Sequence, residues 1–400
     1  DVHALNPERG KIPTPNLDRL AAQSMVFTDA HSGSSVCTPT RYGVQTGRYA
    51  WRTHLQKGIL QPTSPALIAA DRLTLPGMLK AQGYRTAGFG KWHLGQDAPL
   101  TNGNFALDQP FQNDPSTRGY DYHFGSDLRF FAPFMFVENG RFIGTPLFNR
   151  TQPGAKHGAG TPLKPDDFSH ILPTVCDRAI AKLKEFSANP QPFFVYLAPC
   201  APHDPFVPTD AWKGKSGLSV YADYVMETDA EFGRVLTALD QTGLATNTLV
   251  FFASDNGCAP YTGVKGMEEK GHYPSADKRG YKSDIWDGGH HVPFMARWPG
   301  RIRAGTTNSQ TICLTDFMAT CAEVVGAKLP DNAAEDSVSL LPSLLGKPQP
   351  PKHDAVVHHS IDGNFAIREG KWKLIFCSGS GGWSQPKTNS KAGKELPPVQ

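Results

Sequence analysis

Residues 85–95 read RTAGFGKWHLG and combine the two features that decide the fold class. The first five residues are a short, mostly apolar run without helical periodicity, which is typical of a buried strand. A lysine and a histidine follow directly, at Lys91 and His93. The segment therefore predicts a buried strand whose carboxyl end carries chemically active side chains.

Two further segments repeat this pattern. Residues 193–198 (FFVYLA) and 248–253 (TLVFFA) are also short, apolar and flanked by turn residues. Helical periodicity or helix-capping signals occur at 15–24, 74–83, 166–187, 219–242 and 316–325. Strands that alternate with helices predict an α/β fold, with a large, mostly parallel sheet covered by helices on both faces.

The C-terminal part predicts a smaller second structure. Residues 346–351 (GKPQPP) have the composition of a linker. After them, residues 365–368 and 372–376 predict an antiparallel hairpin. We therefore expect a main domain over residues 1–345 and the start of a smaller antiparallel subdomain over 352–400.

The composition excludes several classes of protein. Hydrophobic residues make up 39% of the 400 residues, enough to bury a core, which excludes disorder as the main state. The net charge is only +3 and no run of like charge occurs, so nucleic acid and anionic membranes are not indicated as partners. The longest apolar runs are far shorter than the roughly 20 residues of a membrane span. Seven cysteines show no zinc-type spacing.

Four apolar segments are each followed by a polar cluster. The clusters are 35–41 (SVCTPTR), 90–93 (GKWH), 202–205 (PHDP) and 254–257 (SDNG). Ligands of open α/β sheets bind beyond the carboxyl ends of the strands, so we expect these side chains to line one cleft. Lysine, histidine and arginine beside carboxylate and amide oxygens suit an anion together with a divalent cation.

Cys37 directly precedes Thr38 and Pro39, which begin a predicted helix that runs to Gly47. A helix N-terminus attracts anions and lowers the pKa of a thiol. Arg41, four residues further, would lie one turn away on the same face. The alternative for a lone cysteine is a buried structural role. The C-x5-R loop of cysteine phosphatases is excluded, because position 43 is glycine.

The pattern C-x-P-[ST]-R at 37–41 resembles the signature that sulfatases present for conversion of the cysteine to formylglycine. Further motifs similar to that family follow the family's order along the chain. They are 13–20 (PTPNLDRL), 29–31 (DAH), 46–49 (TGRY), 90–95 (GKWHLG), 202–206 (PHDPF), 254–257 (SDNG) and 286–294 (WDGGHHVPF). The chain is thus identified as a member of the sulfatase family, within the alkaline-phosphatase-like superfamily.

The resemblance implies a nucleophile and groups that bind the substrate anion. Cys37, as hydrated formylglycine, would attack sulfur, and a formylglycine-generating or sulfatase-maturing enzyme would be a partner. Arg41 would hold this nucleophile. Lys91 and Lys282 would bind sulfate oxygens, although for Lys282 an exposed surface lysine is the alternative.

The resemblance also implies roles for two histidines and a metal. His93 would contact the hydrated aldehyde, and His203 would lie beside the leaving oxygen, as a general acid or as part of a rigid turn. Asp255 and Asn256, with modified Cys37, would bind Ca²⁺ or Mg²⁺; on its own, D-N-G would favour a tight turn. The family's paired metal aspartates would precede residue 1. We therefore expect a fragment that begins after this strand and ends within the C-terminal subdomain.

Other residues of these motifs have less specific expectations. His31 is expected to be structural, and His290 and His291 match the family without an assigned role. Tyr120, Tyr122 and Phe124 are expected to pack in the core, with a sugar-stacking surface as the alternative.

The function implied by the resemblance is hydrolysis of a sulfate monoester, aryl or carbohydrate, by an arylsulfatase-like enzyme. We expect a periplasmic or extracellular location, although no signal peptide is visible. The alternatives are a phosphonate monoester or phosphodiester hydrolase of the same superfamily, and a catalytically inactive homologue that binds sulfated glycans.

Overall fold

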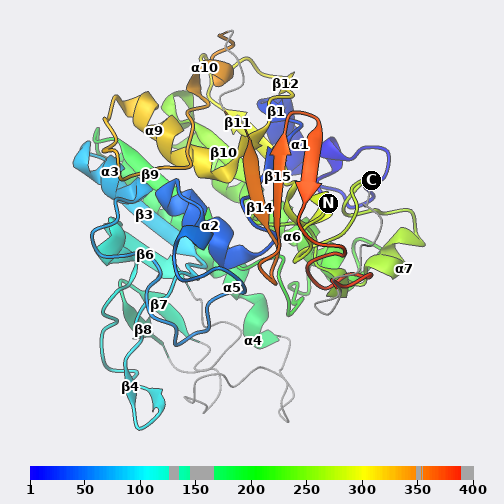
Figure 1. The fold of residues 1–400 in the computed structure, drawn as a ribbon. Coiled ribbons are helices and arrows are strands. Elements are labelled where there is room, and N and C mark those ends of the chain that lie inside the picture. The colour runs from blue at the N-terminus through cyan, green and yellow to red at the C-terminus, as the bar shows by residue number, and fades with distance from the viewer. Residues whose placement is uncertain (126–134, 145–165, 348–352, 354, 389–400) are drawn as a thin grey trace. The chain divides into compact units, whose positions relative to one another are not determined.

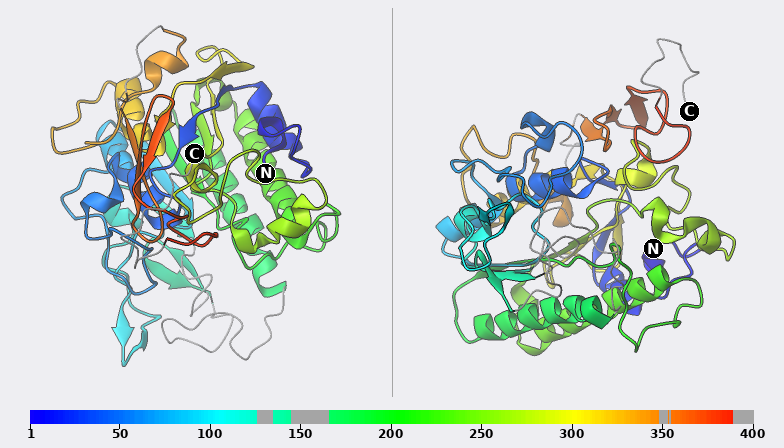
Figure 2. Two further views of the ribbon diagram at one scale, coloured as in Figure 1. Left: turned by 45° about the vertical axis from the view of Figure 1, so that its right-hand side comes forward. Right: turned by 90° about the horizontal axis from the view of Figure 1, so that it is seen from below.

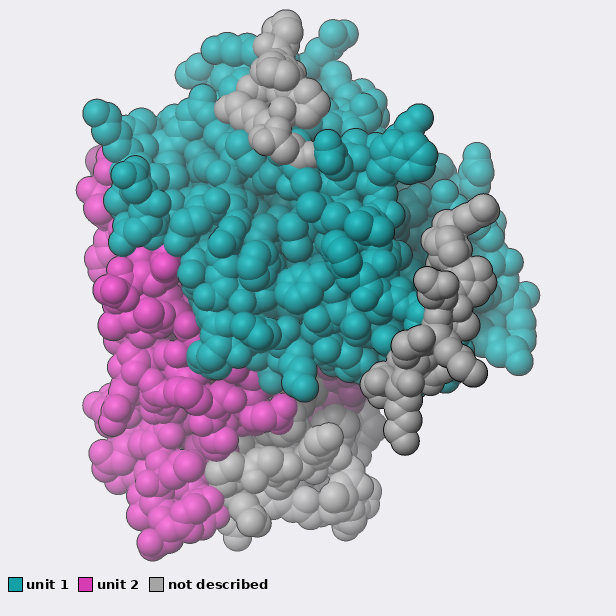
Figure 3. Space-filling model, viewed as in Figure 1, with its two compact units in different colours: residues 1–59, 246–400 teal, residues 60–245 magenta. Residues whose placement is uncertain are grey.

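The structure is a computed structural model that describes residues 1–125, 135–144, 166–347, 353 and 355–388 (Figure 1). The chain divides into two compact units, coloured separately in Figure 3. Unit 1 comprises Asp1–Ile59 and Thr246–Gln400, and unit 2 comprises Leu60–Ala245. Both ends of the chain thus belong to unit 1, and unit 2 is inserted between them in sequence. The domain boundary expected between 345 and 352 stays a prediction.

Unit 2 contains a five-stranded sheet with the order β8-β7-β6-β3-β9. Its strands are β3 (Arg85–Gly90), β6 (Tyr122–Gly125), β7 (Phe136–Glu138), β8 (Arg141–Ile143) and β9 (Phe193–Ala198). Strand β3 is parallel to both β6 and β9, whereas β7 and β8 are antiparallel additions at one edge. The strands predicted at 85–89 and 193–198 are confirmed. A short hairpin, β4 (Leu100–Thr101) and β5 (Asn104–Phe105), completes the described strands of the unit.

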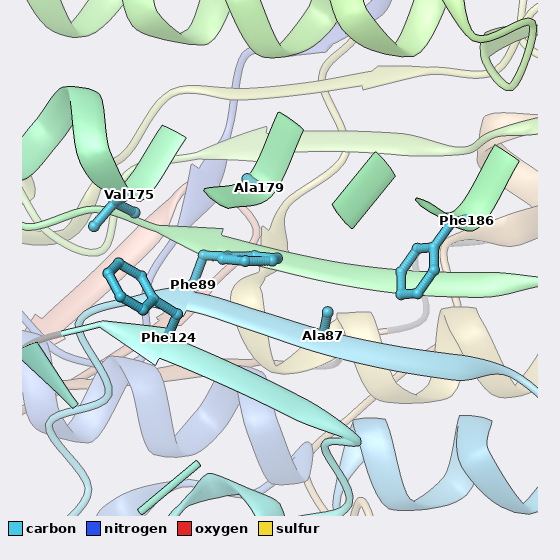
Figure 4. Close-up of a cluster of buried hydrophobic side chains, with 6 residues drawn as sticks. All are labelled: Ala87, Phe89, Phe124, Val175, Ala179 and Phe186. Carbon is cyan, nitrogen blue, oxygen red and sulfur yellow. The ribbon is translucent and has the colours of Figure 1, made fainter. Parts of the chain in front are cut away.

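The helices of unit 2 are α3 (Leu75–Ala81), α4 (Asp166–Ser169), α5 (Ile171–Ser187) and α6 (Val220–Gln241). The Thr74 and Ser219 side chains cap α3 and α6, each accepting a backbone N–H. The helix predicted over 166–187 is interrupted at His170. Helix α5 packs on the sheet through apolar side chains shown in Figure 4, and α6 lies beside α5 in both views of Figure 2.

The aromatic motif at 120–124 belongs to this core. Tyr120 and Phe124 are almost fully buried, and Tyr122 donates from its hydroxyl to Glu138 Oε1 at 2.5 Å. The expectation of a packing role is confirmed, because buried rings cannot serve as a surface on which a sugar stacks.

Unit 1 contains a four-stranded sheet with the order β10-β11-β1-β12. Its strands are β1 (Met25–Phe27), β10 (Val250–Ala253), β11 (Phe294–Arg297) and β12 (Thr306–Asn308). Strand β11 is antiparallel to both β1 and β10, and β12 is parallel to β1. A separate parallel pair joins β2 (Ala30–His31) to β13 (Ile312–Cys313). The α/β class is confirmed, and the four-stranded and five-stranded sheets each combine parallel and antiparallel pairs.

The helices of unit 1 are α1 (Pro15–Ala22), α2 (Cys37–Thr46), α7 (Val264–Glu268), α8 (Asp287–His290), α9 (Phe317–Val325) and α10 (Leu341–Leu344). The helices predicted at 15–24, at the cysteine and at 316–325 are therefore present. No helix in the described part of the chain has the length and apolar character needed to cross a membrane.

The C-terminal hairpin is confirmed as part of a three-stranded antiparallel sheet. Its strands are β14 (Val356–His359), β15 (Phe365–Glu369) and β16 (Trp372–Ile375). One face packs Ile375 and Cys377 against Ile285 and Trp286. Most of the linker expected at 346–351 lies outside the described residues, as do the last residues of the loop expected over 378–400.

Candidate active site

Cys37 is the first residue of α2 and is almost completely buried, with 2% of its surface exposed. The helix starts one residue earlier than predicted, because Val36 is extended and the turn closes at Cys37. The hydroxyl of Thr40 donates to the carbonyls of Ser34 and Val36 at 3.0 and 3.1 Å, which fixes the approach of the chain to the helix. The first backbone N–H groups of α2 therefore surround Cys37, an arrangement that favours an anion.

Arg41 and Asp255 are brought together although they are 214 residues apart in the sequence. Arg41 Nη2 lies 2.9 Å from Asp255 Oδ2, and only 9% of the arginine side chain is exposed. A charge-assisted hydrogen bond in such a buried position is short and directional. It joins the cysteine helix to the loop that follows β10, so two of the predicted site segments meet.

Asn256 presents a buried oxygen that lacks a hydrogen-bond partner among the described residues. Its Nδ2 donates to the carbonyl of Gly257 at 3.0 Å, so Oδ1 points the other way. Gly257 allows the loop to pass close to Gly288, because a Cβ at 257 would lie 1.8 Å from the Gly288 carbonyl oxygen. This contact requires glycine at 257, whereas a Cβ at 288 would instead lie 1.9 Å from the Gly280 carbonyl oxygen. The SDNG loop is not a hairpin turn, since β10 pairs with β11 some forty residues later in the chain.

The donor set of this loop fits a hard cation. A buried polar atom without a partner requires an explanation, and a bound ion is one of the few available. Asp255 supplies carboxylate oxygens and Asn256 an amide oxygen, both typical ligands of Ca²⁺ and Mg²⁺.

Lys282 lies between the cysteine segment and the metal-ligand loop. Its backbone N–H donates to the carbonyl of Cys258 at 2.8 Å, and the next residue, Ser283, donates to the carbonyl of Ser35 at 2.9 Å. Lys282 is buried. An exposed surface lysine is therefore not what the structure shows, and the predicted site residues of unit 1 all belong to segments joined by hydrogen bonds.

In unit 2, Lys91 follows the carboxyl end of β3. Gly90 adopts φ = 94°, and a Cβ there would lie 2.2 Å from the Ala198 carbonyl oxygen. The Lys91 N–H donates to that same oxygen at 2.7 Å. Only glycine permits this close contact, which aligns the start of the GKWH cluster with the end of β9. Lys91 itself is buried.

His93 has a backbone conformation that is rare for a non-glycine residue, with φ = 58°. Its ring Nε2 lies 3.1 Å from the carbonyl oxygen of Leu60, to which it donates. Strained conformations of this kind persist where the surroundings impose them, often at functional sites.

His203 follows β9, the strand paired in parallel with β3. Its Nδ1 lies 2.8 Å from Asp204 Oδ1 and 2.9 Å from the Asp204 carbonyl oxygen. Two acceptors at Nδ1 hold the proton there, so a proton exchanged with a substrate would be carried by Nε2. The three predicted site residues of unit 2 thus all follow the carboxyl ends of two neighbouring strands.

A histidine cluster in unit 1 was not predicted as a group. His31 Nδ1 lies 3.1 Å from His290 Nδ1, and the rings of His290 and His358 stack at 3.8 Å with an interplanar angle of 11°. One ring nitrogen from each of these residues lies within 4.8 Å of the others. The paired histidines at 290–291 and 358–359 were the available sequence signal.

The geometry of this cluster argues against a metal. Ring-nitrogen lone pairs lie in the plane of the imidazole, and zinc ligands need about 2.0–2.1 Å. Nearly parallel rings 3.8 Å apart cannot both direct lone pairs at one ion over that distance. Burial lowers the pKa of His31, His290 and His358, so these rings are neutral. We interpret the cluster as structural, which agrees with the expectation for His31.

A buried ion pair lies beside this cluster. Lys373 Nζ of β16 contacts Asp287 Oδ1 at 2.7 Å and donates to the Ile285 carbonyl at 2.8 Å. Burial lowers the pKa of Lys373. Burial would raise the pKa of Asp287, but the charge and hydrogen bond of Lys373 outweigh it, and that pKa is lowered. The pair fastens the C-terminal sheet to α8.

Comparison with known proteins identifies the family of this chain. Residues 3–327 match the family model described as Sulfatase, and the chain therefore belongs to the sulfatase family. It is 30% identical over 410 residues to an N-acetylgalactosamine-6-O-sulfatase of Bacteroides thetaiotaomicron, covering 91% of this chain and 78% of the relative. It is 33% identical over 386 residues to arylsulfatase A of Bos taurus, covering 91% and 70%.

A solved structure shows the same fold. It comes from work on the metabolism of multiple glycosaminoglycans by Bacteroides thetaiotaomicron, with a TM-score of 0.80 and 28% identity over 91% of this chain and 83% of that one. The protein is a sulfuric ester hydrolase of the arylsulfatase type, and formylglycine and a divalent metal are general to its family. The phosphonate-hydrolase and inactive glycan-binding alternatives are not favoured.

Proposed function

We propose that the protein hydrolyses a sulfate monoester at a site built around Cys37, after conversion of this residue to formylglycine by a maturing enzyme. The observation that carries the proposal is the 2.9 Å contact between Arg41 and Asp255. It joins the helix that begins at Cys37 to the loop in which the Asn256 oxygen has no hydrogen-bond partner among the described residues. An anion-binding helix start and a hard-cation loop in contact are what a sulfate ester requires.

The residues of unit 1 bind the sulfate group and orient the nucleophile. Arg41 lies one helical turn after residue 37 and holds the nucleophilic group there. The positive charge of Arg41 is balanced by the carboxylate of Asp255. Lys282 is a point charge for a sulfate oxygen, with its backbone fixed by the hydrogen bond to Cys258. Asp255 and Asn256, together with modified Cys37, would hold Ca²⁺ or Mg²⁺, which supplies Lewis-acid stabilisation of the charge that develops on sulfate.

Membership of the sulfatase family supports roles in this reaction for three residues of unit 2. Lys91 binds a sulfate oxygen. His93 accepts or donates a proton at the hydrated formylglycine through Nδ1, since Nε2 donates to Leu60. His203 gives a proton from Nε2 to the leaving oxygen, while Asp204 holds Nδ1.

The relatives indicate the kind of ester and where it is met. One relative is an N-acetylgalactosamine-6-O-sulfatase and another is arylsulfatase A. We propose a carbohydrate sulfate as the natural substrate, with small aryl sulfates accepted as well. A polysaccharide substrate is encountered outside the cytoplasm, so we propose a periplasmic or extracellular location.

The test is Cys37→Ala, compared with wild type expressed together with a maturing enzyme. We expect the variant to fold and to release no sulfate, because alanine can neither be oxidised to the aldehyde nor attack sulfur. A tryptic peptide that spans Cys37 should show the aldehyde mass in the wild type. Cys321→Ala, in the interior of α9, is the matched control and should keep its activity. A folded Cys37→Ala variant with wild-type turnover would contradict the proposal.

A further inference from the structure

Two aromatic side chains of unit 1, Tyr261 and Trp383, are largely exposed. Their exposed fractions are 45% and 40%. The ring centroids lie 5.9 Å apart and the planes are inclined by 44°, so the rings form an open pair rather than a closed stack. Exposed apolar groups that gather on one surface commonly mark a ligand site, and aromatic side chains are frequent in such sites.

The loop that carries Trp383 is anchored beside Lys282. The Trp383 N–H donates to Ser283 Oγ and to Asp284 Oδ1, both at 3.0 Å. Asp284 is fully buried and also accepts the N–H of Ser384 at 3.1 Å. These hydrogen bonds tie the tryptophan to the two residues that directly follow the proposed sulfate-binding lysine.

Tyr261 projects from the segment that carries the metal-ligand loop. It lies in a short 3-10 helix, Pro260–Thr262, that follows Asn256 in the chain. The carbonyl of Cys258, between them, accepts the Lys282 N–H at 2.8 Å. Both rings therefore come from segments that are hydrogen-bonded to residues 282–284, although they are far apart in sequence.

We infer that Tyr261 and Trp383 form a stacking surface for a sugar ring of the substrate, next to the sulfate-binding Lys282. A pyranose has a face of C–H groups that packs on an aromatic ring, while its hydroxyl groups remain at the edge and stay hydrated. Two inclined aromatic rings offer a larger contact surface than a single small ring of a substrate can fill. Such a surface suits a sugar that is part of a glycan. The inference rests on the proposed function and narrows its substrate to carbohydrate sulfates.

The test measures kcat and KM for wild type, Trp383→Ala, Tyr261→Ala and the Phe variants of both residues. The substrates are 4-nitrophenyl sulfate and the best substrate from a panel of sulfated disaccharides of chondroitin, heparan and carrageenan. We expect each Ala variant to raise KM for the disaccharide by roughly 2- to 12-fold, with kcat unchanged. The Phe variants should stay near wild type, because the ring face is kept.

Two controls separate this surface from the sulfate site and from the fold. The inhibition constant of inorganic sulfate should be unchanged in every variant, since sulfate has no sugar ring. Trp372→Ala removes a tryptophan that is 75% exposed on β16 and should change neither kcat nor KM.

The possible outcomes distinguish the inference from the proposed function. Unchanged disaccharide KM in both folded Ala variants would overturn the inference and leave the sulfatase proposal standing. Wild-type protein that cleaves 4-nitrophenyl sulfate but none of the disaccharides would also overturn the inference and leave the sulfatase proposal standing. Failure of formylglycine-containing wild type to release sulfate from any ester would instead overturn the proposed function.

Discussion

At the scale of single residues, the side-chain amide of Asn256 is a main indication of a metal site. Its orientation is set by a bond to the neighbouring Gly257 carbonyl, so the oxygen and not the nitrogen faces the site. A carboxamide in this position is a ligand only through that oxygen. Replacement by a side chain of similar shape but without the oxygen therefore isolates the metal contribution.

We expect Asn256→Leu to lose most of the stabilisation by Ca²⁺, whereas Asn256→Asp should retain it. Binding to the folded state alone contributes about 2.7 kcal/mol at a hundredfold excess over the dissociation constant. The measurement is the melting temperature after chelation and after return of Ca²⁺. Asn16→Leu, at a half-buried position of α1 outside the candidate site, is the control. An equal Ca²⁺-dependent shift in wild type and Asn256→Leu would show that Asn256 is not a ligand.

The role of His203 can be separated by the leaving group. A sugar alkoxide needs a proton when the ester breaks, whereas an acidic nitrophenolate leaves almost unaided. His203→Ala should therefore lower kcat far more on a sugar sulfate than on 4-nitrophenyl sulfate, by up to about 10²–10⁴-fold where protonation is needed. Equal losses on both substrates would indicate a structural or sulfate-binding role instead.

At the scale of elements, the ion pair between Lys373 of β16 and Asp287 of α8 helps to hold the C-terminal sheet in place. We expect Lys373→Met to destabilise the protein by about 3 kcal/mol, because removal of one partner leaves the carboxylate of Asp287 poorly compensated. Lys371→Met, at an exposed position before β16, should change stability little. Urea unfolding gives both values.

The pH dependence of this variant offers a second check. The pKa of Asp287 is lower in the folded protein than in the unfolded chain. The contribution of Asp287 to the free energy of unfolding is therefore present above about pH 4 and is lost as the pH falls below that value. The difference in free energy of unfolding between wild type and Lys373→Met should become smaller below pH 4. A difference that stays constant down to pH 3 would contradict an electrostatic origin.

The elements that sequence predicts well are those with enough residues to show a pattern. Strands β3 and β9 are six-residue apolar runs flanked by turn residues, and both were found where expected. Strand β1 has only three residues and β14 contains two histidines, so neither has a recognisable period. Their positions depend on partners far along the chain, such as β11 for β1.

The same distinction holds within the site. Cys37, Arg41 and Asp255 belong to local motifs whose residue types carry the chemistry, so the sequence alone predicts them as site residues. The contact between Arg41 and Asp255 cannot be predicted in this way, because it depends on how α2 and the loop after β10 pack. The histidine cluster also escaped prediction, because the histidine pairs at 290–291 and 358–359 do not by themselves indicate that they meet each other and His31.

At the scale of the whole molecule, neutral buried histidines determine the response to acid. Burial lowers the pKa of His31, His290 and His358, and lowers that of His291 and His359 to about 4. The unfolded chain binds these protons below about pH 6.5 and the folded chain does not, so stability rises with pH in this range. Each histidine contributes about 1.4 kcal/mol per pH unit between its two pKa values.

We therefore expect stability to be nearly constant above pH 7 and to fall steeply between pH 6 and 4.5. Urea unfolding at half-unit intervals measures the slope and hence the number of protons taken up. His359→Gln should reduce that number by about one, because its pKa is lowered to about 4 in the folded protein. Constant stability from pH 7 to 5 would rule out neutral histidines in the folded protein.

The insertion of unit 2 between the two segments of unit 1 has a consequence for synthesis on the ribosome. Strand β1 is made early, but its partner β11 is about 270 residues later. At roughly 5–20 residues per second, β1 waits about 10–60 s for that partner, whereas every strand of the five-stranded sheet is translated within one continuous stretch. The internal unit can therefore be complete on the nascent chain while the first 59 residues are still unpaired. The segment that contains Cys37 is consequently exposed to modifying enzymes during translation, before α2 becomes buried.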